Sequence, residues 1–174
     1  VDFENRPKFT EPEILRTNLS TIILLLLEMN IKNIEEFDFL DAPDGRYIRD
    51  GIKLLQQLDA VSDIMEITEI GRKMAKLPIE PKLARIILAG TDYHCLREIL
   101  VIVSFLAIPD PREMPFEARE KARQIHQKFA HSKSDFMSIL SLWNFFHEQK
   151  ETLSTNKLRT FCRQNFLSYL RLCE

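Results

Sequence analysis

Two prolines only three residues apart, Pro78 and Pro81, fix a break between two helical patterns in the segment Ile67–Ala89. Pro78 has no amide proton to donate and disfavours helical angles at the residue before it, so a helix that reaches it should end at Leu77. Pro81 suits the first turn of the next helix, where a missing donor costs little. Thr68 is placed to cap the first of the two helices. We therefore expect one module to end at residue 77 and another to begin at residue 78.

Residues 10–77 predict a small mixed module. The capping-box spacing of Thr10 and Glu13 starts a helix whose apolar face is so wide that we expect neighbours on most of its sides. A second helix is expected over Gly45–Leu58, and the apolar pairs that flank Ser62–Met65 suit a small β-hairpin. Helix, helix and hairpin, closed by the short helix before the prolines, predict a winged helix. The inward positions of the first helix are expected to be Leu15, Leu19, Ile22, Ile23, Leu26 and Met29.

Residues 78–174 read as a run of helices. Leu96–Ala107 is apolar nearly all round and is expected to be the buried centre of a bundle. An amphipathic helix is expected over Phe116–Ala130, and helical spacing is expected to hold from Lys157 to Arg171. The fold class is therefore mainly α, a winged-helix module with a small β-hairpin followed by a helical bundle. The inward positions of the last helices are expected to be Phe136, Ile139, Leu140, Trp143, Phe146, Leu158, Phe161, Cys162, Phe166, Leu167 and Leu170.

Charge is unevenly distributed along a chain whose net charge is only −2. The segment Glu28–Glu69 carries eleven acidic and four basic residues, whereas Arg112–Lys133 carries six basic and three acidic ones. Between Lys157 and Arg171 all four charged residues are basic. A polyanion would be attracted to the C-terminal half, although solvated helix faces explain the same pattern.

Several classes of function lack their motifs. The chain has neither a G-x-x-x-x-G-K-[ST] phosphate loop nor a G-x-G-x-x-G turn, and its four histidines show no metal-ligand spacing. We therefore predict no catalytic residue and no metal ligand. The longest apolar run, Ile22–Leu27, is far shorter than the ~20 residues that cross a bilayer, so no membrane contact is expected. Three widely spaced cysteines indicate reduced thiols and a cytoplasmic location.

Five motifs follow one another along the chain: PEILRTNL at Pro12–Leu19, FDFLDAPD at Phe37–Asp44, SFLAIPDPREMP at Ser104–Pro115, KSDFMSILSLWNFF at Lys133–Phe146 and FCRQNFLSYLRL at Phe161–Leu172. In this order they resemble the DEAH-box RNA helicases. They are most similar to the bacterial HrpA branch of that family, in the region of its winged helix and its helical helicase-associated, or ratchet, domain. The resemblance covers essentially the whole chain.

This resemblance implies a fragment of an ATP-dependent RNA helicase. Residues 1–9 are then the exit from a motor domain, residues 10–77 the winged helix, and residues 78–174 a ratchet domain that ends before an oligonucleotide-binding barrel. ATP and Mg²⁺ would belong to the missing motor domains, and the fragment alone is expected to be inactive. Its role would be to line the single-stranded RNA channel and support strand separation. Its partners would be that RNA and the missing domains of the same chain.

The strongest candidate RNA-binding residues lie in the basic C-terminal segment. Arg159 and Arg163 are four residues apart, which places them on one outer helix face, with Asn165 and Tyr169 on a neighbouring face. A phosphate backbone would neutralise this positive charge. Acidic groups of the missing barrel, or of the acidic segment Glu28–Glu69, would do the same. The full set of candidates is Arg159, Arg163, Asn165, Tyr169, Arg171, Arg119 and Arg123.

Two other functions remain to be weighed. A protein-interaction or regulatory module would dock a partner through the apolar N-terminal helix. A transcription factor would need a basic recognition helix in the DNA major groove, but Arg46–Leu58 lies in the acidic segment. Salt separates the first alternative from RNA binding, because counterion release makes RNA affinity fall with added salt and apolar docking changes little.

Overall fold

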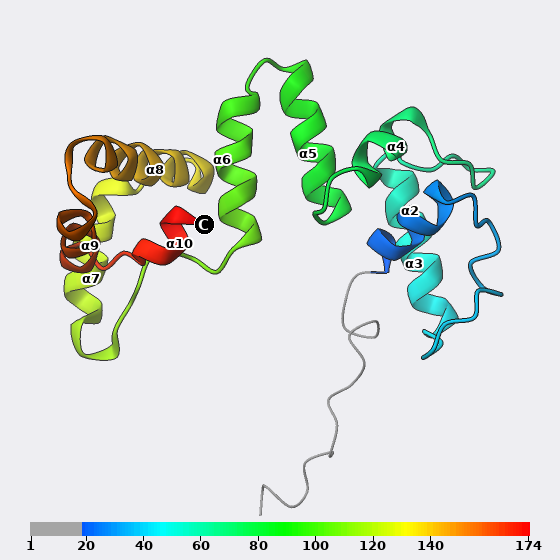
Figure 1. The fold of residues 1–174 in the computed structure, drawn as a ribbon, viewed down its shortest axis with the longest axis horizontal. Coiled ribbons are helices and arrows are strands. Elements are labelled where there is room, and N and C mark those ends of the chain that lie inside the picture. Colours follow the sequence, from blue (N-terminus) through cyan, green and yellow to red (C-terminus); the bar gives the residue numbers. More distant parts are fainter. Residues whose placement is uncertain (1–18) are drawn as a thin grey trace, which may run out of the picture. The chain divides into compact units, whose positions relative to one another are not determined.

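The computed structural model describes residues 19–174 and is built mainly from helices (Figure 1). The chain forms two compact units, the first ending at Leu88 and the second beginning at Ala89. This division lies within helix α5 (Pro81–Asp92). The module boundary between residues 77 and 78 stays a prediction. The expected cap at Thr10 and the inward position Leu15 lie outside the described residues.

The core of the first unit forms where helix α2 (Ser20–Glu28) packs on α3 (Gly45–Gln57) and α4 (Glu69–Ala75). α2 and α3 approach closely at Gly51, where a β-carbon would lie 2.7 Å from Cδ1 of Ile23. A larger residue at this position would push the two helices apart. The buried members of this core are Leu19, Ile23, Leu24, Leu26, Leu27, Ile34, Ile48, Leu55, Ala60, Val61, Met74 and Ala84.

The wide apolar face predicted for the first helix is confirmed for its described part. Ile23 and Leu24 are only 1% and 3% exposed, although Leu25 remains 46% exposed. The inward assignment of Met29 is wrong, because its side chain is 70% exposed. α2 ends at Glu28 and the chain turns at Asn30, whose φ is 64°, so helical periodicity no longer applies at residue 29.

A clear β-hairpin does not form between α3 and α4. Val61 and Ile67 make one antiparallel bridge, and Ser62 N donates to Glu66 O at 2.9 Å. The turn between them has Met65 in the left-handed region, with φ 62°. The two helices end and begin so close to this turn that there is no room for a longer ladder.

The break at the proline joint is confirmed. Oγ1 of Thr68 accepts a hydrogen bond from the amide of Gly71 at 3.0 Å, which caps α4. α4 ends at Ala75, and α5 begins at Pro81, as the missing proline donors require.

The second unit has its core around α8 and α9 rather than around α6. Its buried cluster contains Phe129, Leu142, Phe146, Leu158, Cys162, Leu167 and Leu172. The helices of this unit after α5 are α6 (Leu96–Ala107), η1 (Phe116–Ala118), α7 (Arg119–His126), η2 (Gln127–Phe129), α8 (Asp135–Thr152), α9 (Thr155–Gln164) and α10 (Tyr169–Cys173).

The prediction that Leu96–Ala107 is the buried centre of the bundle is wrong for this chain. The helix forms as expected, but only Ile102 and Val103 are buried in it. Leu100 and Leu106 are 45% and 47% exposed. One side of α6 packs on α8, and that contact is too narrow to cover a helix that is apolar nearly all round.

Two of the expected continuous helices are interrupted. The stretch Phe116–Ala130 divides into η1, α7 and η2, and the last stretch breaks after α9. Phe166 adopts a φ of 52°, which ends helical geometry and resets the periodicity of the residues after it. Leu172 is therefore buried, whereas Leu170, expected inward, is 74% exposed. Phe136, the first inward position expected in α8, is also 52% exposed.

Candidate nucleic-acid interface

The turn between α9 and α10 is held by the proline-rich loop that follows α6, residues 108–115. Glu113 N donates to Phe166 O at 2.8 Å, and Ser168 N donates to Pro111 O at 2.8 Å. These two bonds flank an isolated antiparallel bridge between the loop and the turn. Residues some fifty positions apart in the sequence are therefore fixed side by side by their backbones.

His126, at the end of α7, holds the same turn from another direction. Its Nε2 lies 3.1 Å from both Asn165 O and Phe166 O, so this nitrogen carries the proton and donates to the two carbonyls. The Asn165 side chain accepts from Nζ of Lys128 at 2.6 Å and donates to Phe161 O at 2.8 Å. Asn165 is thus occupied in supporting the turn.

A carboxylate anchors the loop itself. Arg112 donates to Asp110 from Nε at 3.0 Å and from Nη2 at 2.7 Å. Burial alone would raise the pKa of Asp110, but the hydrogen bonds from Arg112 outweigh it and hold that pKa below its ordinary value. Arg171 donates from Nη1 to the carbonyl oxygen of Asp110 at 2.8 Å, so α10 is tied to the same point.

These supports shape an open groove of about 430 Å³ beside α9. The guanidinium carbon of Arg159 lies 5.1 Å from the centre of the Tyr169 ring, within cation–π range. A hydrogen bond with Cys173 raises the pKa of Tyr169 above the ordinary value for tyrosine, so the phenol is neutral at physiological pH as a free tyrosine would be. The groove is lined by Glu113, Arg159, Arg163, Leu167, Ser168, Tyr169 and Leu170.

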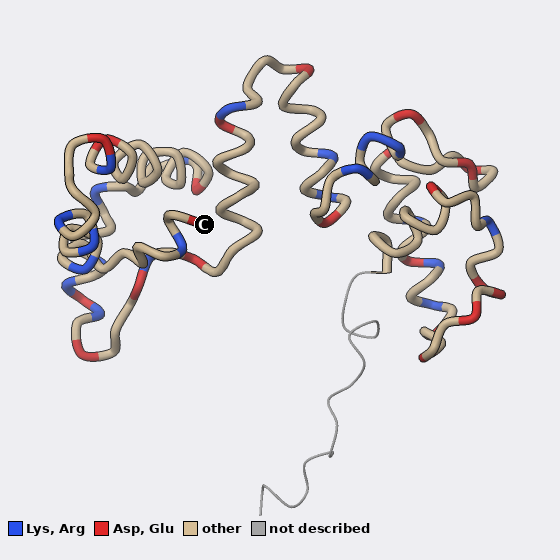
Figure 2. The backbone as a smooth tube through the Cα atoms, viewed as in Figure 1, with Lys and Arg blue, Asp and Glu red and all other residues tan. Residues whose placement is uncertain are grey.

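Three of the seven candidate RNA-binding residues, Arg159, Arg163 and Tyr169, come together in this groove. Asn165 and Arg171 support the turn and the loop instead. Arg119 is exposed at the start of α7, and Arg123 lies 3.7 Å from Glu120 in an ion pair. Figure 2 shows the basic residues of α7 and α9 as blue segments of the second unit. What each of the seven contributes to binding stays a prediction.

Among the lining residues that were not sequence candidates, only Glu113 has a charged side chain. No local pattern identifies it, because it reaches the groove only through the backbone pairing of the loop with the turn. It stands next to Arg112 in the segment SFLAIPDPREMP, which was noted only as a family resemblance. The guanidinium of Arg163 makes no ion pair and no hydrogen bond in the part of the chain that the structure describes.

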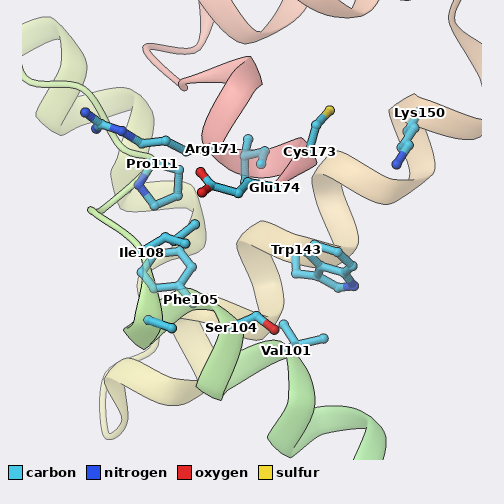
Figure 3. Close-up of a pocket in the computed structure, with 12 residues that line it drawn as sticks. Val101, Ser104, Phe105, Ile108, Pro111, Trp143, Lys150, Arg171, Cys173 and Glu174 are labelled. Atoms are coloured by element: carbon cyan, nitrogen blue, oxygen red, sulfur yellow. The ribbon is translucent and has the colours of Figure 1, made fainter. Parts of the chain in front are cut away.

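A second hollow, of about 320 Å³, lies between the C-terminal half of α6, α8 and α10 (Figure 3). Its lining is mainly apolar, with Phe105, Ile108 and Trp143 among the larger side chains. No cluster of three His, Cys, Asp or Glu side chains suited to a metal occurs within residues 19–174. None of the helices described is both long and apolar enough to span a membrane.

Comparison with known proteins identifies the two parts of the chain. Residues 51–79 match the helicase associated domain (HA2), winged-helix, and residues 80–139 match the helicase associated domain (HA2), ratchet-like. Across 99% of its length the chain is 44% identical to the ATP-dependent RNA helicase HrpA homolog of Haemophilus influenzae and 41% identical to the ATP-dependent RNA helicase HrpA of Escherichia coli.

A human relative is similar over nearly the same stretch. The chain is 37% identical over 96% of its length to the ATP-dependent RNA helicase DHX33 of Homo sapiens. It spans 14% of the length of each HrpA relative and 23% of the human one. With winged-helix and ratchet-like matches in series and this identity from end to end, the chain belongs to the HA2 family of helicase-associated domains, in its HrpA-type branch.

Proposed function

We propose that this chain is the accessory region of an ATP-dependent RNA helicase and that the groove beside α9 holds single-stranded RNA. The main support is the placement of Arg159 over Tyr169. Arg163 lies in the same groove, and its side chain has no partner among residues 19–174. The identity of 41–44% to proteins named as HrpA RNA helicases supports the enzyme class.

The groove offers the two kinds of contact that single strands use. Guanidinium groups make charge-assisted hydrogen bonds to phosphate oxygens, and the segment Lys157–Arg171 that supplies them carries no acidic residue of its own. The face of a neutral Tyr169 and the plane of Arg159 are surfaces on which bases stack. In the intact protein this groove would form part of the RNA channel and support the separation of the strands.

ATP hydrolysis would come from motor domains elsewhere in the intact protein, where ATP and Mg²⁺ would bind. We expect the 174-residue chain alone to show no RNA-stimulated ATP turnover, because it contains no phosphate-binding loop of the Walker type.

The test is the double variant Arg159→Ala/Arg163→Ala, with binding to a fluorescent uridine 12-mer measured by anisotropy over a series of salt concentrations. We expect affinity at low salt to fall at least about tenfold and the slope of log affinity against log salt to become shallower by about 0.7 per lost phosphate contact. The matched control is Lys150→Ala/Lys157→Ala, which removes the same charge from the same unit outside the groove.

Unchanged affinity and slope in the arginine variant, together with a lower melting temperature, would make both arginines structural and refute the proposal. An equal effect of the lysine variant would show that net charge alone attracts RNA. The alternative of a docking module loses its main support, because the described residues of the apolar N-terminal helix mostly pack inside the first unit.

A further inference from the structure

A carboxylate lines the groove that also holds the two arginines. Glu113 belongs to the loop after α6, and its amide is fixed at 2.8 Å from Phe166 O. Among the described residues its side chain makes no ion pair within 4.0 Å and no hydrogen bond, although Arg159 and Arg163 line the same groove. A carboxylate repels phosphate, so its place in a groove for a polyanion requires a different explanation.

We propose that this groove selects a guanine base of single-stranded RNA, whose Watson–Crick edge donates two hydrogen bonds to the Glu113 carboxylate. The inference rests on the proposed RNA-binding function and names the base that the same groove prefers. The donors are the N1–H and the N2 amino group of guanine, which point in the same direction and match the two oxygens of an ionised carboxylate.

The other bases cannot make this pair. An ionised carboxylate only accepts hydrogen bonds, so any acceptor on the base edge that faces it is repelled. Adenine and cytosine each place a ring-nitrogen acceptor beside their amino donor, and uracil has one N–H between two carbonyl oxygens. Guanine alone offers two adjacent donors on its Watson–Crick edge, which is one of the edges by which proteins recognise unstacked bases.

The remaining walls complete the recognition. The base would stack on the layer formed by Arg159 and Tyr169. The Arg163 side chain, which lines the same groove and has no partner among the described residues, would bind a flanking phosphate. The groove volume of about 430 Å³ falls within the ~300–1,000 Å³ range of pockets that hold small ligands, so one base fits.

The experiment compares five fluorescent RNA 12-mers by anisotropy at low salt. One is all uridine, and the others carry a single central guanine, inosine, adenine or cytosine. We expect the chain to bind the guanine probe at least about fivefold more tightly than the uridine, adenine and cytosine probes. Inosine, which lacks the N2 amino group, should fall between them.

The diagnostic variant is Glu113→Gln, which keeps the shape of the side chain but replaces one acceptor by a donor. It should lose the preference for guanine while binding the uridine probe at least as tightly as the parent, since a negative charge is removed from the groove. Circular dichroism melts serve as the control that the variant is folded.

The outcomes separate the two proposals. Equal binding of all five probes, still dependent on Arg159 and Arg163, would overturn guanine selection and leave RNA binding intact. RNA binding that is unchanged in the Arg159→Ala/Arg163→Ala variant would overturn the proposed function. A Glu113→Gln variant that weakens every probe by the same factor would make Glu113 a structural residue and also overturn the selection.

Discussion

Replacing Leu142 by Ala should destabilise the second unit far more than replacing Leu100 by Ala. Leu142, on α8, is 1% exposed and belongs to the buried cluster of that unit. Leu100, on α6, is 45% exposed. The two substitutions delete the same atoms from two helices, so the difference between them measures which helix forms the core.

The expected magnitudes follow from burial. Leu142→Ala removes a fully buried side chain and leaves a cavity, which costs about 2–5 kcal/mol. Leu100→Ala removes a side chain of which roughly half is already in water, a loss of about 1 kcal/mol. Alanine also has a better helix propensity than leucine, which reduces the loss at position 100 by roughly a few tenths of a kcal/mol.

Differential scanning calorimetry of the 174-residue chain measures both effects. For a unit of ~60–100 residues, 1 kcal/mol shifts the melting temperature by about 4–8 °C, so Leu142→Ala should lower the melting of the second unit by at least about 8 °C. Leu100→Ala should lower it by no more than about half as much. If the two shifts are equal, or Leu100→Ala gives the larger one, α6 is a core helix and the burial argument is refuted.

Three further perturbations test other parts of the structure. Gly71→Ala would drive a β-carbon into the backbone carbonyl oxygen of Ala60. We therefore expect the urea midpoint of the first unit to fall by the equivalent of about 1–3 kcal/mol, and an unchanged midpoint would contradict this clash. The pKa of Asp110 is lowered because hydrogen bonds from Arg112 outweigh burial, so its contribution to stability is present at neutral pH and is lost as pH falls through that lowered pKa. Asp110→Asn should therefore flatten the acid limb of a stability–pH curve, and an unaltered limb would refute the coupling. Burial raises the pKa of the Cys162 thiol to about 11, so iodoacetamide at pH 8 should label the exposed Cys173 well before it, which peptide mass spectrometry can detect; equal labelling would mean that the core opens.

Local features of the sequence determined the proline joint and its cap. Pro78 and Pro81 act on their own backbone, and Thr68 bonds an amide three residues away, so neither effect needs a distant partner. The mainly helical fold and most helix positions follow for the same reason, since 3.6-residue periodicity is a property of each segment. The motifs within the segments also identified the family correctly.

Tertiary structure decided how the apolar residues were used. The composition of Leu96–Ala107 shows that this helix avoids water, but a sequence pattern does not say how many neighbours cover it, and Leu100 and Leu106 remain half exposed. Similarly, Phe166 carries no feature that predicts a φ of 52°, so the change of register that buries Leu172 in place of Leu170 was not foreseen.

The sequence predicted one part of the groove, and tertiary contacts supplied the other part. Helical spacing was sufficient to pair Arg159 with Arg163, because both lie on one helix. Tyr169 joins them by way of a turn that His126 holds and the proline-rich loop braces, and Glu113 arrives from that loop. The loop and the turn are joined through backbone atoms far apart in the chain. Because every residue has the same backbone acceptor, and every residue except proline the same backbone donor, the amino-acid sequence does not reveal which of them pair.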